Sequence, residues 1–334
     1  DDIRNNSLTH ILMIKAQTTL SILFLSSFLF FDCSNEQKTK DYIITERDLI
    51  PEGLTVDSST GTIYIGSTYK RKVIQISPDG TISDLFPQEK DGIWSPVGLE
   101  VDENTGILWI NTAHANAVMP LINPEVGSDW MTGVSAYDLK RKQFIKHYPL
   151  DEEQGFFNDL TVLPNGEVYI TESLNNSIYR VNSTNHQLEL FWSTSEYNFL
   201  NGITYFPLDN SIFVTSSEGI LKINLTTKEH IILETPPDLN SRGIDGIDLS
   251  GNILIGHQST KVSKFFINPK GDKITDVELL DSGDEFDSST TGELSAGYYY
   301  FIVNSQIQSA IDPNSKRIKP ADSLNNIIIR KIKF

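Results

Sequence analysis

A short sequence phrase recurs along this chain from position 51 onward, and it limits the available folds more than any other feature. Each copy begins with Gly or Asp, continues with alternating apolar residues, turns through Asp, Asn or Gly, and ends in a second apolar stretch. The copies span residues 53–66, 98–111, 159–170, 202–214 and 246–256, with a degenerate copy at 292–303. A repeat at intervals of about 45 residues is typical of proteins built from repeated structural units.

The pattern within each copy predicts a β-hairpin. Period-2 alternation interrupted by Thr-Gly, Asn-Gly or Gly-Asn is the signal of two strands joined by a tight turn. A second pair of strands is expected after each hairpin, as at residues 72–77 and 81–86. Four short strands per unit indicate propeller blades, and about six blades can be counted. We therefore predict an all-β fold, a six-bladed β-propeller over residues 41–334, with an open β-sandwich pair as the competing fold.

The two ends of the repeat region also carry strand patterns. Residues 41–45 and 326–334 are rich in Ile, and we expect both to contribute to the last blade. Such sharing would close the ring and remove the open edges of the sheets. The second unit is longer than the others because residues 120–130 are inserted, and this insertion is a candidate lid.

The segment before the repeats has the pattern of a targeting signal. Lys15 is followed by an apolar run over residues 20–31, which is too short for a membrane span of about 20 residues. It matches the hydrophobic region of a secretory signal. Cys33 stands where a bacterial lipoprotein carries its lipidated cysteine, although Asp32 precedes it where a small residue is preferred.

These features divide the N-terminal part of the chain. We interpret residues 1–12 as an addition outside the natural protein, 13–33 as a signal peptide and 34–40 as a tether. The protein is expected to be exported to the periplasm or cell surface, with Cys33 as a candidate lipid anchor to the membrane. An ordinary cleaved signal with an incidental cysteine is the alternative.

The charge and cysteine content exclude several kinds of partner and bond. The chain has 44 acidic and 27 basic residues, a net charge of −17, and a single cysteine. Such a surface repels phosphate backbones, so nucleic acid is not an expected partner. One cysteine cannot form an internal disulfide. We expect a monomer.

The residues just before each repeated phrase converge on the propeller axis, because the first strand of each blade lines the central channel. Four of the first five copies place an oxygen-bearing side chain there, namely Glu52, Asn158, Asn201 and Asp245. Two carboxylates and two amide carbonyls suit a hard cation such as Ca²⁺, which would also offset the repulsion between the carboxylates. Asn and Asp beside Gly are also common turn formers. Four such residues in register favour a divalent metal site.

These residues lie in motifs that resemble a known family. From Glu52 to about Ser305 the chain resembles the senescence-marker-protein/gluconolactonase family and its relatives, regucalcin and the paraoxonases. The motifs that carry the resemblance are Pro51-Glu52-Gly53-Leu54, Asn158-Asp159-Leu160-Thr161-Val162, Asn201-Gly202-Ile203 and Asp245-Gly246-Ile247-Asp248. The resemblance implies a six-bladed propeller, an axial divalent cation, often calcium, and hydrolysis of lactones or esters. It also implies Glu52, Asn158, Asn201 and Asp245 as the metal ligands.

The resemblance also indicates catalytic candidates. Asp245 would act as the general base or orient the attacking water, although ligation of a metal would lower its basicity. His114 follows the second blade at a position that resembles a paraoxonase histidine near the substrate, where it could shuttle a proton. His257 holds the same register in the fifth blade. For both histidines the alternative is a loop residue satisfied by hydrogen bonds.

The motifs leave two classes of function open. The leading hypothesis is an exported, metal-dependent hydrolase whose substrate is a small lactone or ester. The alternative is a non-catalytic propeller that binds a ligand or a protein and holds a structural cation. A third hypothesis is an enzyme that acts on a different bond, as strictosidine-synthase-like or phosphotriester-hydrolysing relatives do. Val97 stands where some relatives have a polar group, which favours a more apolar substrate than a sugar lactone.

Overall fold

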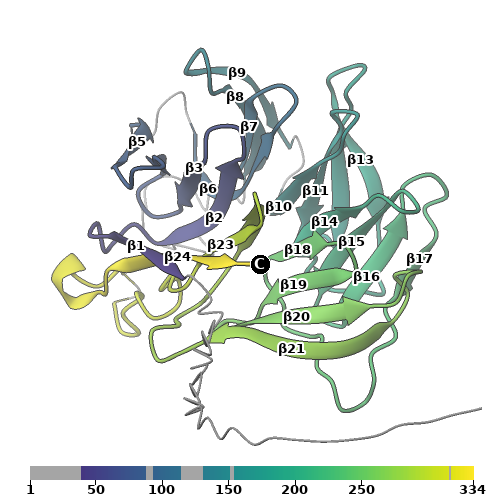
Figure 1. The fold of residues 1–334 in the computed structure, drawn as a ribbon. Helices are drawn as coiled ribbons and strands as arrows, with labels where there is room; N and C mark the ends of the chain where they lie inside the picture. The colour runs from purple at the N-terminus through teal and green to yellow at the C-terminus, as the bar shows by residue number, and fades with distance from the viewer. Residues whose placement is uncertain (1–38, 88–92, 114–130, 151–153, 316) are drawn as a thin grey trace, which may run out of the picture. The chain divides into compact units, whose positions relative to one another are not determined.

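The computed structural model describes residues 39–87, 93–113, 131–150, 154–315 and 317–334. The strands of this part form six four-stranded antiparallel sheets, which are the blades of a propeller (Figure 1). The predicted all-β, six-bladed fold is therefore confirmed. The predicted signal peptide, the tether up to residue 38 and the insertion at 120–130 lie outside the described residues. Within the described part, no helix is long and apolar enough to cross a membrane.

In each blade the strands follow one another from the axis outward. Blade 1 consists of β2 (Pro51–Asp57), β3 (Thr62–Ser67), β4 (Lys72–Ile76) and β5 (Ile82–Phe86). Blade 2 consists of β6 (Ser95–Asp102), β7 (Ile107–Ala113), β8 (Thr132–Asp138) and β9 (Gln143–Pro149). Blade 3 consists of β10 (Phe157–Val162), β11 (Val168–Glu172), β12 (Ser177–Val181) and β13 (Leu188–Ser193).

The second half of the ring repeats this order. Blade 4 consists of β14 (Ile203–Phe206), β15 (Ser211–Ser216), β16 (Gly219–Asn224) and β17 (His230–Ile232). Blade 5 consists of β18 (Ile247–Ser250), β19 (Ile253–His257), β20 (Lys261–Ile267) and β21 (Ile274–Ser282). Blade 6 consists of β22 (Gly292–Ser295), β23 (Tyr298–Ile302), β24 (Ile327–Lys333) and β1 (Lys40–Ile44), and the short 3₁₀ helix η2 (Ala321–Ser323) precedes β24.

The last blade takes strands from both ends of the propeller, as the sequence predicts. β1 pairs antiparallel with β24, and Ile44 lies opposite Ile327 (Figure 1). The Arg330 guanidinium binds both carboxylate oxygens of Asp41 at 2.8 Å and also contacts Asp281 of blade 5 at 2.9 Å. Pairing β1 with β24 covers a strand edge that would otherwise offer free backbone groups to other chains.

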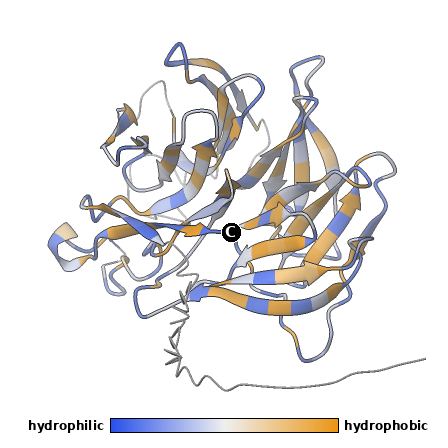
Figure 2. Ribbon diagram, in the orientation of Figure 1, coloured by the Kyte–Doolittle hydropathy of each residue, from blue (hydrophilic) through white to orange (hydrophobic). Residues whose placement is uncertain are grey.

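The hydrophobic core is divided into clusters that lie between neighbouring blades. Ile44, Ile329 and Leu54, for example, pack together and join blade 6 to blade 1. The inner strand of each blade contacts the inner strand of the next, and β22 contacts β2, so the ring is continuous. Hydrophobic residues concentrate in the strands of every blade (Figure 2), because each blade is covered on both faces by its neighbours.

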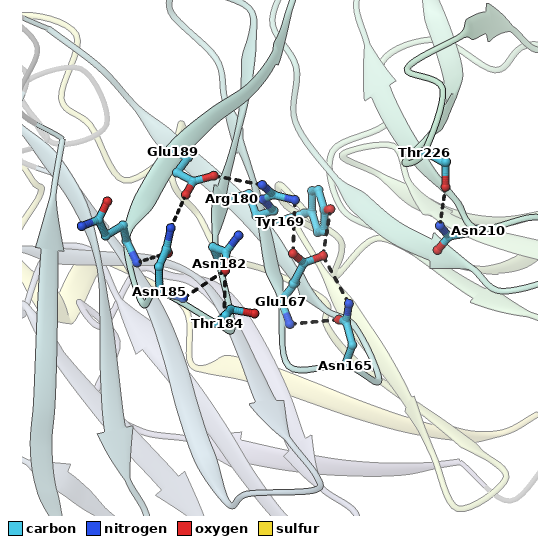
Figure 3. A network of polar contacts seen from close by, with 11 residues as sticks. Asn165, Glu167, Tyr169, Arg180, Asn182, Thr184, Asn185, Glu189, Asn210 and Thr226 are labelled. Atoms are coloured by element: carbon cyan, nitrogen blue, oxygen red, sulfur yellow. Dashed lines mark hydrogen bonds and ion pairs between the residues drawn. The ribbon is translucent and has the colours of Figure 1, made fainter.

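Strands β11, β12 and β13 of blade 3 carry a polar network, and Figure 3 also draws a separate contact between Asn210 and Thr226 of blade 4. Arg180 lies 3.2 Å from Glu167 and 2.9 Å from Glu189, and the Tyr169 hydroxyl donates to Glu167 at 3.1 Å. Surface ion pairs of this kind contribute about 0–1 kcal/mol each. We assign this network to the local order of blade 3, because none of its residues lines the cavity at the start of the inner strands.

Candidate metal centre

The four predicted ligands lie around one small cavity at the end of the axis where the inner strands begin. The cavity measures about 20 Å³, which is room for one water molecule or one ion. Asp159 and Thr290 line it as well, and Thr290 holds in blade 6 the position that Asp245 holds in blade 5. The structure thus brings Glu52, Asn158, Asn201 and Asp245 together. That they bind a cation stays a prediction.

Close packing of the inner strands explains why the phrase so often begins with Gly. A Cβ atom on Gly53 would collide with the Val97 carbonyl oxygen of the next blade. A Cβ atom on Gly202 would likewise collide with the Asp245 carbonyl oxygen. The Gly202 N–H donates to the Asp245 carbonyl oxygen at 3.0 Å, which ties blade 4 to blade 5. Only Gly permits this approach of two backbones. The residue before each Gly is thereby held at the axis.

Local backbone geometry then directs these side chains. In blades 1 to 3 the pairing between the inner strand and its neighbour shifts by one residue across the ligand position, for example between Pro51 and Leu54. Such β-bulges reorient a side chain. Two residues before the ligand position, the backbone is left-handed at Ile50 (φ 46), Phe199 (φ 55) and Ser288 (φ 57). Positive φ is unusual for Ile and Phe, and such strain concentrates at functional sites.

Hydrogen bonds fix the orientation of the two amides. The Ser173 hydroxyl donates its proton to the Leu200 carbonyl oxygen at 2.5 Å, so toward Asn158 it can only accept. The atom of Asn158 that faces it at 3.1 Å is therefore the nitrogen. Asn201 likewise donates its side-chain nitrogen to Asp245 Oδ1 at 2.7 Å. Both amides thus keep their oxygens free of these bonds, which is the arrangement that a cation requires.

Glu52 supplies a further indication. Its Oε2 atom is buried and has no hydrogen-bond partner among the described residues. A buried acceptor without a donor costs about 1–3 kcal/mol, and more when it is charged. Among the described residues, no group of three or more His, Cys, Asp or Glu side chains is placed to hold a metal. The candidate centre is of another kind, because amide oxygens take half of the positions, and an all-oxygen donor set fits Ca²⁺.

Burial and mutual repulsion act on the carboxyl groups of the cavity. Burial raises the pKa of Glu52 well above its usual range, and the charges of Asp245 and Asp159 raise it further. Burial raises the pKa of Asp159 to about 7 and that of Asp245 to about 6, although the hydrogen bond from Asn201 lowers the latter. Among the described residues that line the cavity, none is basic. A cation would therefore compensate negative charge that the protein leaves unbalanced.

A second ring of polar residues lies on the inner strands, three residues after the candidate ligand position of each blade. The sequence did not predict it. Its members are Thr55, Glu100, Thr161, Thr204, Asp248 and Glu293. Glu293 accepts a hydrogen bond from the Val56 N–H of the next blade at 2.9 Å, and Glu100 accepts one from the Val162 N–H at 3.0 Å. Burial raises the pKa of Glu293 to about 8. Glu293 and Glu100 thus bind backbone amides on the free edge of the neighbouring inner strand.

The two candidate histidines have different outcomes. His114 lies outside the described residues. His257 is completely buried, with Nδ1 2.8 Å from the Ser289 hydroxyl and Nε2 2.7 Å from the Tyr299 hydroxyl. The Ser289 hydroxyl donates to the Ile302 carbonyl oxygen, so Nδ1 carries the proton and Nε2 accepts one from Tyr299. Burial lowers the pKa of His257 to about 3. The idea of His257 as a proton shuttle is therefore wrong, and this residue joins blades 5 and 6.

Val97, the departure from the family pattern, belongs to a small apolar cluster. It is buried and packs with Ala113 and Phe156 beside the cavity of the candidate metal centre. Phe156 is held in place by Glu172, whose Oε1 accepts the Phe156 N–H at 2.8 Å. This side of the site therefore offers apolar contact rather than hydrogen bonds.

Comparison with known proteins shows the fold. No established family matches the sequence, and no curated protein is significantly similar to it. A gluconolactonase from Xanthomonas campestris has 12% sequence identity and a TM-score of 0.60, with 88% of this chain and 90% of that chain covered. The allergen Mala s 1 of Malassezia sympodialis has 13% identity, a TM-score of 0.66 and coverages of 88% and 96%.

A virginiamycin B lyase from Staphylococcus aureus has 17% identity, a TM-score of 0.59 and coverages of 90% and 100%. A hydrolase, an allergen and a lyase thus share this architecture, so the fold does not select among functions. At these identities the likeness establishes the propeller fold, and the residues of the site must carry any functional argument.

Proposed function

We propose that this protein is a metal-dependent hydrolase of lactones or esters, with a divalent cation, Ca²⁺ by its donor set, held by Glu52, Asn158, Asn201 and Asp245. The observation that carries the proposal is the unpaired, buried Oε2 of Glu52 beside two amides whose nitrogens donate to Ser173 and to Asp245, which turns their oxygens away from these bonds. The motif resemblance to the gluconolactonase family and the fold shared with a gluconolactonase support it.

The division of labour within the site follows from these contacts. A cation bound there would supply Lewis-acid polarisation of the substrate carbonyl and stabilise the negative charge that develops on its oxygen. Asp245 uses Oδ1 to accept the hydrogen bond from Asn201, and its Oδ2 accepts no hydrogen bond from the described residues, so Oδ2 is available to the cation or to a water molecule. Burial raises the pKa of Asp245, which favours acceptance of a proton, whereas a bound cation would lower that pKa again.

Asp245 is therefore the proposed general base. It takes a proton from the attacking water as the water oxygen bonds to the carbonyl carbon, and it returns that proton to the leaving alcohol oxygen when the ester bond breaks. Asp159 lines the same cavity, but both of its oxygens accept backbone N–H groups, those of Leu160 at 2.9 Å and Ile203 at 3.2 Å. It is consequently a poorer candidate for the base.

The test is hydrolysis of gluconolactone, an acyl-homoserine lactone and phenyl acetate by the purified protein, with Ca²⁺ and with a chelator. We expect turnover that requires the cation and falls by about 10²–10⁴-fold in Asp245→Asn, the range for loss of a general base. Asp238→Asn, at an exposed loop carboxylate, is the matched control. Cation binding that raises thermal stability without turnover of any substrate would instead support the non-catalytic binding propeller.

A further inference from the structure

A second cavity adjoins the candidate metal centre, and the proposed chemistry leaves it without a role. It measures about 250 Å³ and shares Asn201 and Asp245 with the metal cavity. Its other walls come from blades 4, 5 and 6. A concave space of this size beside reactive groups is where a small molecule would bind.

Apolar side chains form one part of its wall. Phe199, Ile244 and Ile307 line the cavity, and the Phe199 side chain is 51% exposed although it is large and aromatic. The left-handed backbone at Phe199 is fixed by its N–H, which donates to Asn176 Oδ1 at 2.7 Å. An exposed aromatic ring on a constrained backbone offers contact area at little entropic cost.

The polar part of the wall is uncharged. Ser217, Ser259 and Gln308 line the cavity, and within the described part of the chain these residues form hydrogen bonds through their backbone groups and none through their side chains. Their hydroxyl and amide groups are therefore available to a ligand. The hydroxyls of Ser216 and Ser289, by contrast, are used within the protein.

Charge is the most selective property of this cavity. Among its described lining residues, the only ionisable side chain is Asp245, and there is no Lys, Arg or His. Glu52 and Asp159 lie in the adjoining metal cavity. A divalent cation in the adjoining cavity would offset at most two of these three carboxylate charges, and the described lining of both cavities contains no basic side chain. A carboxylate or phosphate on the ligand would therefore meet excess negative charge, so anionic molecules are disfavoured.

We propose that this cavity binds the acyl portion of the substrate, and that the substrate is an uncharged ester or lactone with an apolar group beside the reactive carbonyl. This inference rests on the proposed hydrolytic function, because the carbonyl must lie at Asn201 and Asp245, where the two cavities meet. The apolar cluster of Val97, Ala113 and Phe156 on the other side of the metal cavity fits the same substrate class.

Two esters of equal length provide the test. 4-Nitrophenyl butyrate ends in a methyl group, and the 4-nitrophenyl monoester of succinic acid ends in a carboxylate. That carboxylate also attacks its own ester, so both rates are corrected for the uncatalysed reaction. We expect kcat/KM for the butyrate to be at least about tenfold higher, as one unfavourable charge contact in a partly buried site predicts. Ser217→Lys supplies a counter-charge on the cavity wall and is expected to reverse the preference.

Phe199→Ala is the second variant. It should lower kcat/KM for the butyrate about tenfold, mainly through KM. Leu208→Ala is the matched control, because Leu208 is 74% exposed on the same blade and does not line the cavity. Equal rates for the two esters, together with a Phe199→Ala variant that behaves like Leu208→Ala, would overturn the proposal.

Binding of stable amide analogues separates this proposal from the hydrolytic function. N-phenylbutyramide should bind to the protein, and N-phenylsuccinamic acid should bind at least about tenfold more weakly. The Phe199→Ala variant should bind N-phenylbutyramide more weakly than the wild type does. If neither ester is hydrolysed but the amides follow this pattern, the hydrolytic function fails and the neutral cavity stands. If neither amide binds and neither ester is turned over, the cavity proposal is overturned as well.

Discussion

Glu293 shows how a single side chain in this ring can carry both a structural role and an electrostatic cost. It accepts the Val56 N–H of the neighbouring blade, yet it is half-buried near the charges of Asp248 and Glu103. Burial is the main reason that its pKa rises from the usual 4.5 to about 8. The folded protein therefore holds the Glu293 proton more tightly than the unfolded chain does, and this residue lowers stability as the pH rises.

The predicted consequence is a pH-dependent gain in stability for Glu293→Gln. The amide keeps an oxygen for the Val56 N–H and removes the charge. The difference in free energy of unfolding between Glu293→Gln and the wild type should grow between pH 4.5 and about 8 and then level off. Its slope should be at most about 1.4 kcal/mol per pH unit. Urea unfolding in the presence of chelator measures it. Glu278→Gln, on the exposed face of β21, is the control, and a constant difference across this range would refute the account.

Residue-level features also mark the limit of what the sequence predicts. Glu52, Asn158, Asn201 and Asp245 could be found because each precedes the same repeated phrase. Ser173 and Glu172 could not, because they act on residues of other strands through the fold. The left-handed backbone of Ile50 and Phe199 gives no sequence signal either, since both residue types normally avoid it.

Strands and hairpins form the next level, and here the sequence was most informative. Thr-Gly and Gly-Asn turns mark the hairpins, and Gly61, Gly106 and Gly251 adopt the positive φ that these turns require. Alternation within one strand, however, does not show what the neighbouring blade contributes. The polar ring of Glu100, Asp248 and Glu293 was missed for this reason, although a polar residue in an otherwise buried inner strand was the available signal.

The contribution of β1 to closing the ring can be tested by comparing a buried and an exposed residue of this strand. Ile44 is 2% exposed and packs against blade 1, whereas Ile43 is 46% exposed. We expect Ile44→Ala to lower the free energy of unfolding by about 2–5 kcal/mol, the usual cost of truncating a buried Ile. Ile43→Ala should cost less than about 0.5 kcal/mol. Urea unfolding of the two variants decides the matter, and equal losses would mean that β1 contributes no packing to the closed ring.

At the scale of the whole molecule, the ring places six strand starts around one axis and so assembles a site from residues far apart in sequence. Glu52 and Asp245 belong to blades 1 and 5, and they share one cavity with groups from blades 3 and 4. A larger cavity opens beside it between blades 4 and 6. The proposed cation would link blades that otherwise meet only through their neighbours, so its binding should also stabilise the folded ring.

Calorimetric titration of the chelator-treated protein with Ca²⁺ tests the central claim most directly. The wild type should bind one cation at the axis, and Glu52→Gln should bind it far more weakly. Ser173→Ala removes the hydrogen bonds to the Asn158 amide and to the Leu200 carbonyl oxygen, and it should lose about 10–100-fold in affinity. Glu196→Gln, at an exposed position, should bind like the wild type. Saturable binding that both variants at the axis leave unchanged, or no binding at all, would contradict the metal centre.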